Sequence, residues 1–241
     1  MQAYTLIAGA TSGLGLAIAR ELSTSKRLIL LGRNISKLEA VKKEIGGNHL
    51  LLCIDLTEVG LIVDRLSSYL LSGGLKVDKF IHCAGVDQTL PVKSLGAESF
   101  DVLMRVNFYS AVEIVRVLIK RSVNRSALKN VLFVSSISAI RGFKAKAAYS
   151  ASKAALDAYM RVLAKELAPN VTVNSILPGA VLTPMSQSEF DNPDLVKHFE
   201  EIYPLGIGSV QQLIKVLRFY HDADDLWVTG QQIVVDGGMT G

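Results

Sequence analysis

Short apolar runs alternate with longer amphipathic stretches along nearly the whole chain. Continuous short apolar runs are typical of strands that are buried on both faces of a parallel sheet. Such runs are predicted as strands at residues 4–8, 27–31, 49–54, 79–83, 130–134, 171–176 and 232–235. Between them apolar residues recur at helical spacing, most clearly at residues 16–22, 36–45, 98–121 and 149–167. The alternation predicts a single α/β domain over residues 1–241, with a doubly wound, seven-stranded parallel sheet covered by helices on both faces.

Residues 185–203 interrupt this alternation. The segment is irregular and polar, and it follows the carboxyl end of the sixth predicted strand. Loops of this length are uncommon in compact domains unless they have a function, and ligands of open parallel sheets gather at the carboxyl ends of the strands. We therefore expect a substrate lid here, and a short packed helix in the same segment would be compatible with it.

The first predicted strand runs into the turn Gly9-Ala10-Thr11-Ser12-Gly13-Leu14-Gly15 and then into an amphipathic helix. Strand, glycine turn and helix in this order form the phosphate-binding unit of dinucleotide-binding, Rossmann-type sheets. Glycine is needed where the backbone turns tightly and where it approaches the pyrophosphate, and the helix N-terminus offers free N–H groups to the phosphates. An ordinary surface loop is the alternative.

The end of the second predicted strand indicates which dinucleotide binds. An NAD enzyme places a carboxylate there to bond the ribose 2′-hydroxyl, whereas this chain has Gly32 followed by Arg33. A guanidinium can bind a 2′-phosphate through paired hydrogen bonds, and a carboxylate would repel it. Arg33 therefore predicts NADP(H), with an ordinary surface arginine as the alternative. Asp55, after the third predicted strand, is expected to cap the next helix, to reach the adenine amino group, or both.

Tyr149 and Lys153 lie four residues apart in a predicted helix, so their side chains share one face. A nearby ammonium favours the phenolate and would lower a pKa that is about 10 in free tyrosine. Tyr149 would then exchange protons near neutral pH, although such pairs also arise by chance on many helices.

Small and polar residues stand where further strands end. Ala84-Gly85 closes the fourth predicted strand and would let a ligand lie against it, and Ser135-Ser136 closes the fifth. Asn107 lies among apolar residues of a predicted helix. A buried amide is costly unless its hydrogen bonds are satisfied, so Asn107 either mends a local kink or holds a water.

Composition excludes several other classes of protein. Apolar residues make up 49% and charged residues 20% of the chain, as in a globular protein with a substantial core. The net charge is +4, but Lys and Arg are scattered, so no nucleic-acid partner is expected. No apolar stretch is long enough for a membrane span, and the N-terminus lacks a basic region with a cleavage site. We expect a cytoplasmic protein without a membrane partner.

Cys53 and Cys83 sit inside apolar runs and are predicted to be small buried hydrophobes rather than a disulfide. The histidines show no ligand spacing with either cysteine, so no metal site is expected.

Together these residues resemble the short-chain dehydrogenase/reductase family, in its single-domain form, over essentially the whole chain. Each motif alone is common, but their joint order and spacing are specific. The matching positions are Gly9-x-x-x-Gly13-x-Gly15, Asp55, Ala84-Gly85, Asn107, Ser136, Tyr149-x-x-x-Lys153, Pro178-Gly179 with Thr183, and Thr229-Gly230-Gln231 to Asp236-Gly237-Gly238.

The resemblance implies an NADP(H)-dependent oxidoreductase that interconverts a carbonyl and a secondary alcohol by hydride transfer. Tyr149 would be the acid/base, and Lys153 would lower its pKa and bond the nicotinamide ribose. Ser136 would stabilise the carbonyl oxygen, and Asn107 would hold a water that links Lys153 to solvent. Ser136 is chosen over Ser135 because its distance from Tyr149 along the chain matches the family spacing.

The resemblance also implies cofactor contacts and an assembly. Homotetramers or homodimers would form through the predicted helices 98–121 and 149–167, and the apolar tail 227–239 could add a second interface. The cofactor contacts it implies are Gly9, Thr11, Ser12, Gly13, Leu14, Gly15, Arg33, Asn34, Asp55, Leu56, Cys83, Ala84, Gly85, Asn107, Tyr149, Lys153, Pro178, Gly179, Val181 and Thr183.

The chain departs from the family pattern at three positions. Ala8 replaces a usual threonine, His82 replaces a usual asparagine, and Ser12 stands where many NADP members carry a second basic residue. Altered hydrogen bonding rather than lost activity is expected from the first two, and the NADP(H) prediction rests mainly on Arg33.

Several substrates and functions stay open. The basic stretch 141–146 would favour an anionic or carrier-bound substrate, or it is a solvated loop. The resemblance includes 3-oxoacyl-[acyl-carrier-protein] reductases, and a sugar, a steroid or a small ketone is also open. A non-catalytic NADP-binding protein would normally lack Tyr149 or Lys153. A sugar-nucleotide epimerase or dehydratase would normally carry a larger C-terminal domain.

Overall fold

The computed structural model describes residues 3–223 and 225–241, and within them one parallel sheet has the strand order β3-β2-β1-β4-β5-β6-β7. The first strand, β1, pairs with β2 on one side and with β4 on the other. The chain therefore reverses its direction of winding between β1 and β4, as in Rossmann-type sheets. The predicted fold class is confirmed, with small shifts of the strand ends. The strands are β1 (Tyr4–Ala8), β2 (Leu28–Gly32), β3 (Leu50–Cys53), β4 (Val77–His82), β5 (Asn130–Val134), β6 (Thr172–Pro178) and β7 (Gln232–Val235).

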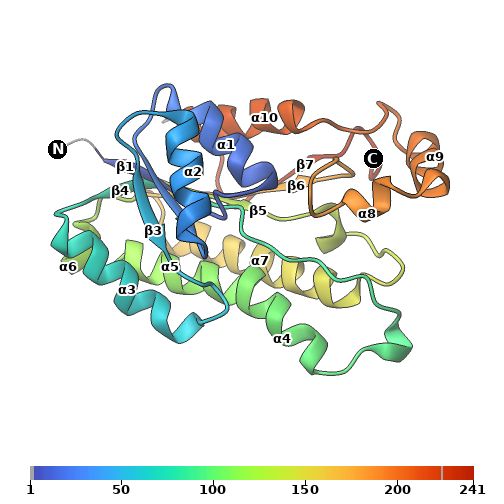
Figure 1. Cartoon of the computed structure of the whole chain (residues 1–241), viewed down its shortest axis with the longest axis horizontal. Coiled ribbons are helices and arrows are strands. Elements are labelled where there is room, and N and C mark those ends of the chain that lie inside the picture. Colours follow the sequence, from blue (N-terminus) through green and yellow to red (C-terminus); the bar gives the residue numbers. More distant parts are fainter. Residues whose placement is uncertain (1–2, 224) are drawn as a thin grey trace.

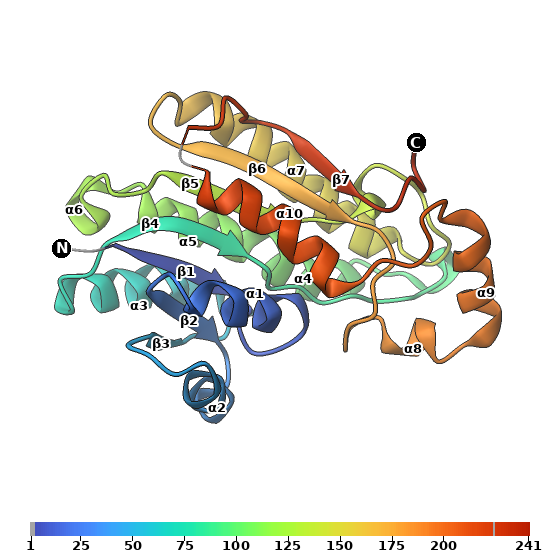
Figure 2. The ribbon, with the colours of Figure 1, turned by 90° about the horizontal axis from the view of Figure 1, so that it is seen from above.

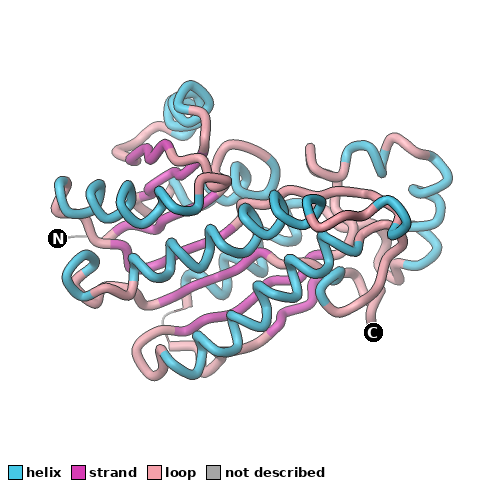
Figure 3. The backbone as a smooth tube through the Cα atoms, turned by 90° about the horizontal axis from the view of Figure 1, so that it is seen from below, coloured by secondary structure: helices cyan, strands magenta, loops and turns pink. Residues whose placement is uncertain are grey.

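Helices cover both faces of the sheet (Figures 1 and 2). One face carries α1 (Gly13–Ser23), α2 (Ile35–Ile45) and α10 (Val210–Asp222). The other carries α3 (Val59–Ser72), α4 (Glu98–Met104), α5 (Ser110–Leu118), α6 (Arg121–Asn124) and α7 (Ala147–Glu166), several of which run beside one another in Figure 3. The last two helices, α8 (Gln187–Phe190) and α9 (Pro193–Ile202), lie beyond the carboxyl ends of the strands (Figure 2).

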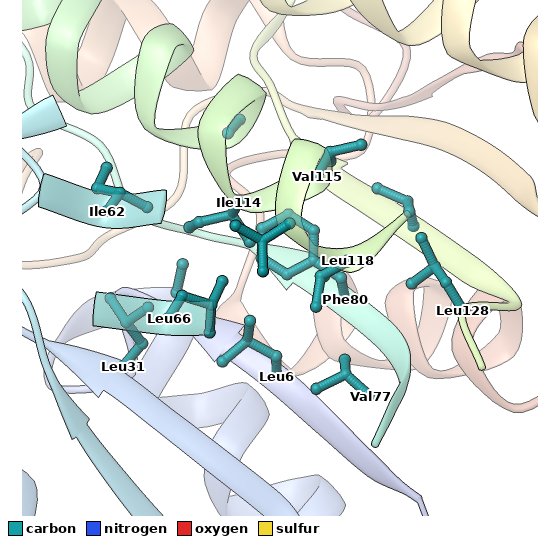
Figure 4. Close-up of a cluster of buried hydrophobic side chains, with 14 of the residues drawn as sticks. Leu6, Leu31, Ile62, Leu66, Val77, Phe80, Ile114, Val115, Leu118 and Leu128 are labelled. Atoms are coloured by element: carbon teal, nitrogen blue, oxygen red, sulfur yellow. The ribbon is translucent and has the colours of Figure 1, made fainter. Parts of the chain in front are cut away.

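Two hydrophobic cores follow from the alternation of side chains along the strands. Leu6 points into a cluster with residues of α3 and α5, where Figure 4 shows it near Leu66 and Phe80. Its neighbour Ile7 points to the opposite face and packs with residues of α1 and α10. Because both faces of the central strands are covered, these strands read as continuous apolar runs in the sequence.

The helix predicted over residues 98–121 is not continuous. A π-helical turn at Arg105–Tyr109 separates α4 from α5, and α5 ends at Leu118. An extra residue in such a turn changes the direction of the side chains on either side of it. The turn places Asn107 in a buried position, so a local kink is present, but the Asn107 side chain does not mend it because it bonds Val86 and Ser152 instead of the helix backbone.

The predicted lid, residues 185–203, contains α8 and α9 rather than an irregular loop. The tilted rings of Phe190 and Phe199 lie 5.8 Å apart between centres, and Phe199 meets Tyr203 edge-on at 6.1 Å. Phe199 and Tyr203 also pack with Leu177 of β6 in a third hydrophobic cluster, so the segment is attached to the end of the sheet.

Cys53 is exposed, so its prediction as a buried hydrophobe is wrong. The reason is that β3 forms an edge of the sheet and Cys53 is its last residue. Among the described residues, no helix combines the length and the apolar character needed to cross a membrane.

Candidate active site

The glycine turn after β1 leaves no room for a side chain at two positions. A Cβ atom at Gly15 would lie 2.1 Å from the backbone oxygen of Gly9, and a Cβ atom at Gly9 would lie 2.7 Å from the backbone nitrogen of Ala84. Gly9 also has a φ of +86°, which side-chain-bearing residues rarely adopt. The start of α1, the end of β1 and the segment after β4 therefore meet backbone to backbone.

The N-terminus of α1 is suited to a phosphate. Ser12 is its N-cap, and within the described chain the Ser12 side chain makes no capping hydrogen bond. Across the turn, a Cβ atom at Gly13 would lie 3.8 Å from both Cδ of Pro184 and Cβ of Thr183. The free N–H groups and the positive end of the helix dipole thus lie in a recess between the turn and residues 183–184.

The end of β2 is crowded where an NAD site would carry its carboxylate. A Cβ atom at Gly32 would lie 3.1 Å from Cγ2 of Thr11 and 3.4 Å from Cδ2 of Leu38. Arg33, the next residue, is exposed. The only charged side chain that the strand end offers is therefore the guanidinium of Arg33, within the residues that the structure describes.

Asp55 and Asn34 lie at the same edge of the sheet. The Oδ1 atom of Asp55 accepts hydrogen bonds from N–H and Oγ1 of Thr57 at 2.9 and 2.8 Å, which hold the pKa of Asp55 below its usual value. The N-cap of α3 is Glu58, so the prediction that Asp55 caps the next helix is wrong. The side chain of Asn34 caps α2 instead.

Asn107 fixes the loop that follows β4. Its Oδ1 accepts from the N–H of Val86 at 2.8 Å, and its Nδ2 donates to the oxygen of Val86 and to Oγ of Ser152, both at 2.9 Å. A Cβ atom at Gly85 would lie 3.5 Å from both Oδ1 of Asn107 and Nζ of Lys153. The π-helical turn, the loop after β4 and α7 are therefore joined at one point.

His82 stands behind this point. Ser110 donates its hydroxyl to the oxygen of Val106 at 2.7 Å, so the 2.8 Å contact between His82 and Ser110 is a bond donated by Nε2–H of the imidazole. Burial lowers the pKa of His82 to about 3, so the ring is neutral. The histidine that departs from the family pattern thus braces the end of the π-helical turn from β4.

Tyr149 and Lys153 lie one turn apart on α7, with Nζ of Lys153 5.8 Å from the centre of the phenol ring. Lys153 is buried and donates to the oxygen of Val134 at 2.8 Å. Ser136, at the end of β5, accepts from the N–H of Ser138 at 3.1 Å, and its hydroxyl acts on the Tyr149 phenol to lower its pKa. The structure thus brings Ser136, Tyr149 and Lys153 together beside Asn107. We call Asn107 and its hydrogen bonds to Val86 and Ser152 the Asn107 clamp.

The pKa of Tyr149 is shifted in the direction opposite to the prediction. Burial of the phenol raises this pKa, the negative charges of Asp87 and Glu189 raise it further, and the hydrogen bond with Ser136 opposes them only in part. Burial also lowers the pKa of the Lys153 ammonium to about 8. In the protein alone the phenol therefore keeps its proton at neutral pH.

Sequence reasoning missed a buried carboxylate behind Lys153. The Oδ2 atom of Asp157 accepts from Oγ of Ser135 at 3.0 Å and from Nε2 of Gln232 at 2.8 Å. Its charge favours the protonated form of Lys153. Spacing could have revealed it, because Asp157 follows Lys153 by one helical turn on the same face.

The other predicted contacts surround the same edge of the sheet. Leu56 and Ala84 are buried, and burial raises the pKa of the Cys83 thiol to about 12, so the thiol is protonated. On the other side, Val181 bridges to Gly208, and the N–H of Thr183 bonds Oγ of Ser186 at 3.0 Å. Gly179, after Pro178, packs so closely that a Cβ atom would lie 2.8 Å from the ring of Tyr203.

The residues of this edge combine a phosphate recess with a protonated phenol, a buried amine and a serine hydroxyl. Within residues 3–223 and 225–241, no group of three or more His, Cys, Asp or Glu side chains could hold a metal ion. The phenol, the amine and the serine hydroxyl suit proton transfer to an oxygen atom of a ligand that lies next to a bound dinucleotide.

Comparison with known proteins agrees with this chemistry. A family model described as enoyl-(acyl carrier protein) reductase matches residues 9–240. L-xylulose reductase of Bos taurus is 27% identical over 237 residues, covering 97% of this chain and 95% of the relative. The 3-oxoacyl-[acyl-carrier-protein] reductase FabG of Buchnera aphidicola is 28% identical over 241 residues, covering 97% and 96%.

A solved structure extends the similarity to three dimensions. The structure of a 4-hydroxyisoleucine dehydrogenase complexed with NADH has a TM-score of 0.90 and 27% sequence identity. The match covers 99% of this chain and 98% of that chain. The whole sheet, with its helices, is therefore shared.

Proposed function

This chain belongs to the short-chain dehydrogenase/reductase family, and on that premise we propose that it is an NADP(H)-dependent enzyme that interconverts a carbonyl and a secondary alcohol. Membership makes it an oxidoreductase that acts on carbonyl and alcohol groups with a nicotinamide cofactor. The choice of NADP(H), the residue roles and the single-domain organisation are our proposal. The observation that carries it is the meeting of Ser136, Tyr149 and Lys153 beside the Asn107 clamp.

The glycine turn and the strand ends fit a dinucleotide. The side-chain-free cradle at Gly9 and Gly15 would hold the pyrophosphate at the N-terminus of α1. Arg33 would bind the 2′-phosphate, and Asp55 would accept a hydrogen bond from the adenine amino group. When bound, the nicotinamide supplies or accepts the hydride.

Tyr149 would hold the proton for the carbonyl oxygen. The phenol carries its proton at neutral pH, as an ordinary tyrosine does, and is therefore in the form that donates to a carbonyl oxygen during reduction. Ser136 would donate a hydrogen bond to the same oxygen as negative charge develops there. The Lys153 ammonium would bond the nicotinamide ribose and lower the pKa of Tyr149 once the ligands order the site.

Asn107 would keep the loop after β4 at the correct distance from α7. Both N–H groups of the Asn107 amide already bond protein groups, so the proposed water that links Lys153 to solvent would donate to the second lone pair of Oδ1, beside the N–H of Val86. Residues 185–203 would close over the substrate, since Cε of Met185 lies 3.7 Å from a Cβ atom built at Gly85.

The apolar side chains exposed on the helices support assembly into a homodimer or homotetramer. Tyr109, at the end of the π-helical turn, is 45% exposed, and Val162 of α7 is 53% exposed. A cytoplasmic location remains part of this proposal.

An acyl thioester is the second candidate substrate. It is favoured by the similarity to the Buchnera reductase over 97% of this chain. Neutral ketones, sugars and acyl thioesters should therefore be compared as substrates in the same reduction assay.

The proposal is tested by carbonyl reduction with NADPH and with NADH. Turnover should be faster with NADPH, and Tyr149→Phe should reduce kcat by about 10²- to 10⁴-fold while NADPH binding, followed by nicotinamide fluorescence, is retained. Tyr159→Phe is the matched control, because this tyrosine lies on the same helix and packs against Phe108 and Phe133 instead. A Tyr149→Phe protein with full activity would refute the role of Tyr149, and equal use of both cofactors would refute NADP(H) preference.

A further inference from the structure

Three charged side chains from distant parts of the sequence meet at the mouth of the candidate site. Lys146, the N-cap of α7, forms an ion pair with Oδ2 of Asp87 in the loop after β4. Its Nζ also lies 2.7 Å from Oε1 of Glu189 on α8. Their side chains are 13%, 17% and 28% exposed, so the ion pairs are largely shielded from solvent. We call Lys146, Asp87 and Glu189 the mouth cluster.

The mouth cluster lies close to the phenol of Tyr149. Lys146 precedes Tyr149 by three residues at the start of the same helix. The carboxylates of Asp87 and Glu189 both act electrostatically on Tyr149, and that of Asp87 also acts on Lys153. A substrate oxygen that receives a proton from Tyr149 therefore brings the rest of its molecule close to these carboxylates.

One oxygen of the cluster is left without a partner. Among the described residues, Oδ1 of Asp87 is buried and has no hydrogen-bond partner, and the same holds for Oε1 of the adjacent Gln88. Buried polar atoms in folded proteins nearly always have a partner. The two oxygens of residues 87 and 88 therefore call for donor groups from outside the chain.

Two of the three cations in the basic stretch 141–146, Arg141 and Lys146, already have partners. Lys146 is already shared by two carboxylates, which leaves the mouth cluster with a net negative charge. Arg141 donates to the backbone oxygen of Met239 at 3.0 Å. A carboxylate or phosphate on the substrate would meet like charge here, and an apolar chain would leave the acceptors unpaired.

From these contacts we propose that Asp87 and Gln88 bind hydroxyl groups of an uncharged, polyhydroxylated carbonyl compound, such as a ketose, and its polyol product. This inference rests on the proposed function and narrows its substrate class. Oδ1 of Asp87 accepts a charge-assisted hydrogen bond from a substrate hydroxyl, while Oδ2 stays bound to Lys146. Glu189 holds α8 against the same cluster, and because Oδ1 of Asp87 is buried in this arrangement, the hydroxyls reach it when this contact opens.

The test compares ketones of equal chain length. Reduction of a ketopentose, 2-pentanone and a five-carbon keto acid is measured with the preferred cofactor. A site built around hydroxyl groups should give a kcat/KM for the ketopentose at least about 10-fold above that for 2-pentanone, and the keto acid should be the poorest substrate. A higher kcat/KM for 2-pentanone or for the keto acid would overturn the inference but leave the proposed function intact.

Substitution of Asp87 locates the effect. Asp87→Ala should raise KM for the ketopentose about 10-fold or more, with little change in KM for 2-pentanone and in cofactor affinity. A change in kcat that arises through Tyr149 should be the same for both ketones. Asp101→Ala, an exposed aspartate of α4, is the matched control. Asp87→Asn, which keeps the shape of the side chain, is used if the alanine variant does not fold, and it too should raise KM for the ketopentose.

Weaker cofactor binding with unchanged KM for the ketopentose would overturn the inference, because the carboxylate would then face the cofactor. If none of a broad panel of carbonyls is reduced, the proposed function fails and this inference fails with it.

Discussion

The two parts of the candidate site are built in different ways. The recess at β1, α1 and β2 consists mainly of backbone and glycine, and the charged side chain of Arg33 beside it is exposed. The pocket at β4, β5 and α7 consists of buried polar side chains, among them Asn107 and Lys153, that are held by hydrogen bonds. Recognition of a phosphate by backbone needs space and few particular side chains. Proton transfer needs particular side chains in a dry environment, which opposes stability. Free energies of unfolding should therefore respond to substitution differently in the two parts.

The largest effect is expected where space is the requirement. Gly15→Ala puts a Cβ atom 2.1 Å from the oxygen of Gly9, so α1 must move and the free energy of unfolding should fall by about 3 kcal/mol or more. Gly60→Ala in α3 is the control, since a Cβ atom there meets nothing within 4 Å and should be neutral or stabilising. Urea unfolding measures both. A tolerated Gly15→Ala would mean that backbone space does not define the recess.

The next effect belongs to the polar pocket. Asn107→Ala removes the bonds to Val86 and Ser152 and leaves the Val86 backbone unpaired, which should lower the free energy of unfolding by about 2–3 kcal/mol. The exposed N-cap Asn192 provides the control, because Asn192→Ala should lower it by only about 1 kcal/mol. Urea unfolding measures both variants. If the two substitutions lower the free energy of unfolding equally, the buried amide of Asn107 contributes no more to stability than an exposed one.

A gain in stability is expected from removal of the buried amine. Lys153→Met abolishes an ammonium whose pKa burial lowers to about 8, at the expense of the bond to Val134. The net result at pH 7 should be about 1–2 kcal/mol of added stability, together with loss of turnover.

The pH dependence of this gain has a definite sign. The folded-state pKa of Lys153 lies below its ordinary value, so the wild-type protein gains stability as pH rises above about 8 and the amine loses its charge. The advantage of Lys153→Met should therefore shrink by about 1 kcal/mol between pH 7 and pH 9. A constant or growing advantage would mean that the Lys153 ammonium of the folded protein does not lose its charge between pH 7 and pH 9.

The smallest effect on stability is expected at Arg33. Because the side chain is exposed, Arg33→Ala should change the free energy of unfolding by less than about 0.5 kcal/mol. NADPH binding should nevertheless weaken by about 10-fold or more, and NADH binding should hardly change, because only the 2′-phosphate contact is lost. Fluorescence titrations with the two cofactors measure this difference. Equal losses for NADPH and NADH would show that Arg33 does not distinguish them.

The same division explains what the sequence could predict. The strands, the glycine turn and the shared face of Tyr149 and Lys153 follow from local patterns, and the structure has all of them. The direction of the Tyr149 pKa shift was wrong because it depends on burial and on charges from distant segments. The mouth cluster was missed for the same reason, since Asp87, Lys146 and Glu189 come together only in the folded chain.

Two local features could not be predicted from the hydrophobic periodicity of the sequence. Helical periodicity continues through residues 98–121, so the π-helical turn at Arg105–Tyr109 left no signal except the polar Asn107. Cys53 looked buried because its run is apolar, and periodicity does not tell an edge strand from a central one.

The strand order also bears on how the protein is made. Each strand after β1 pairs with one that has already been synthesised: β2 and β4 with β1, β3 with β2, and β5, β6 and β7 each with the preceding strand. A chain emerging from the ribosome thus has a sheet edge ready for every new strand. The helix α10, by contrast, is among the last elements to emerge, so the side of Ile81 and Leu132 that packs with Ile214 and Leu217 stays open to water until then. Late translation is therefore the interval in which the nascent chain is most exposed to aggregation and most in need of a chaperone.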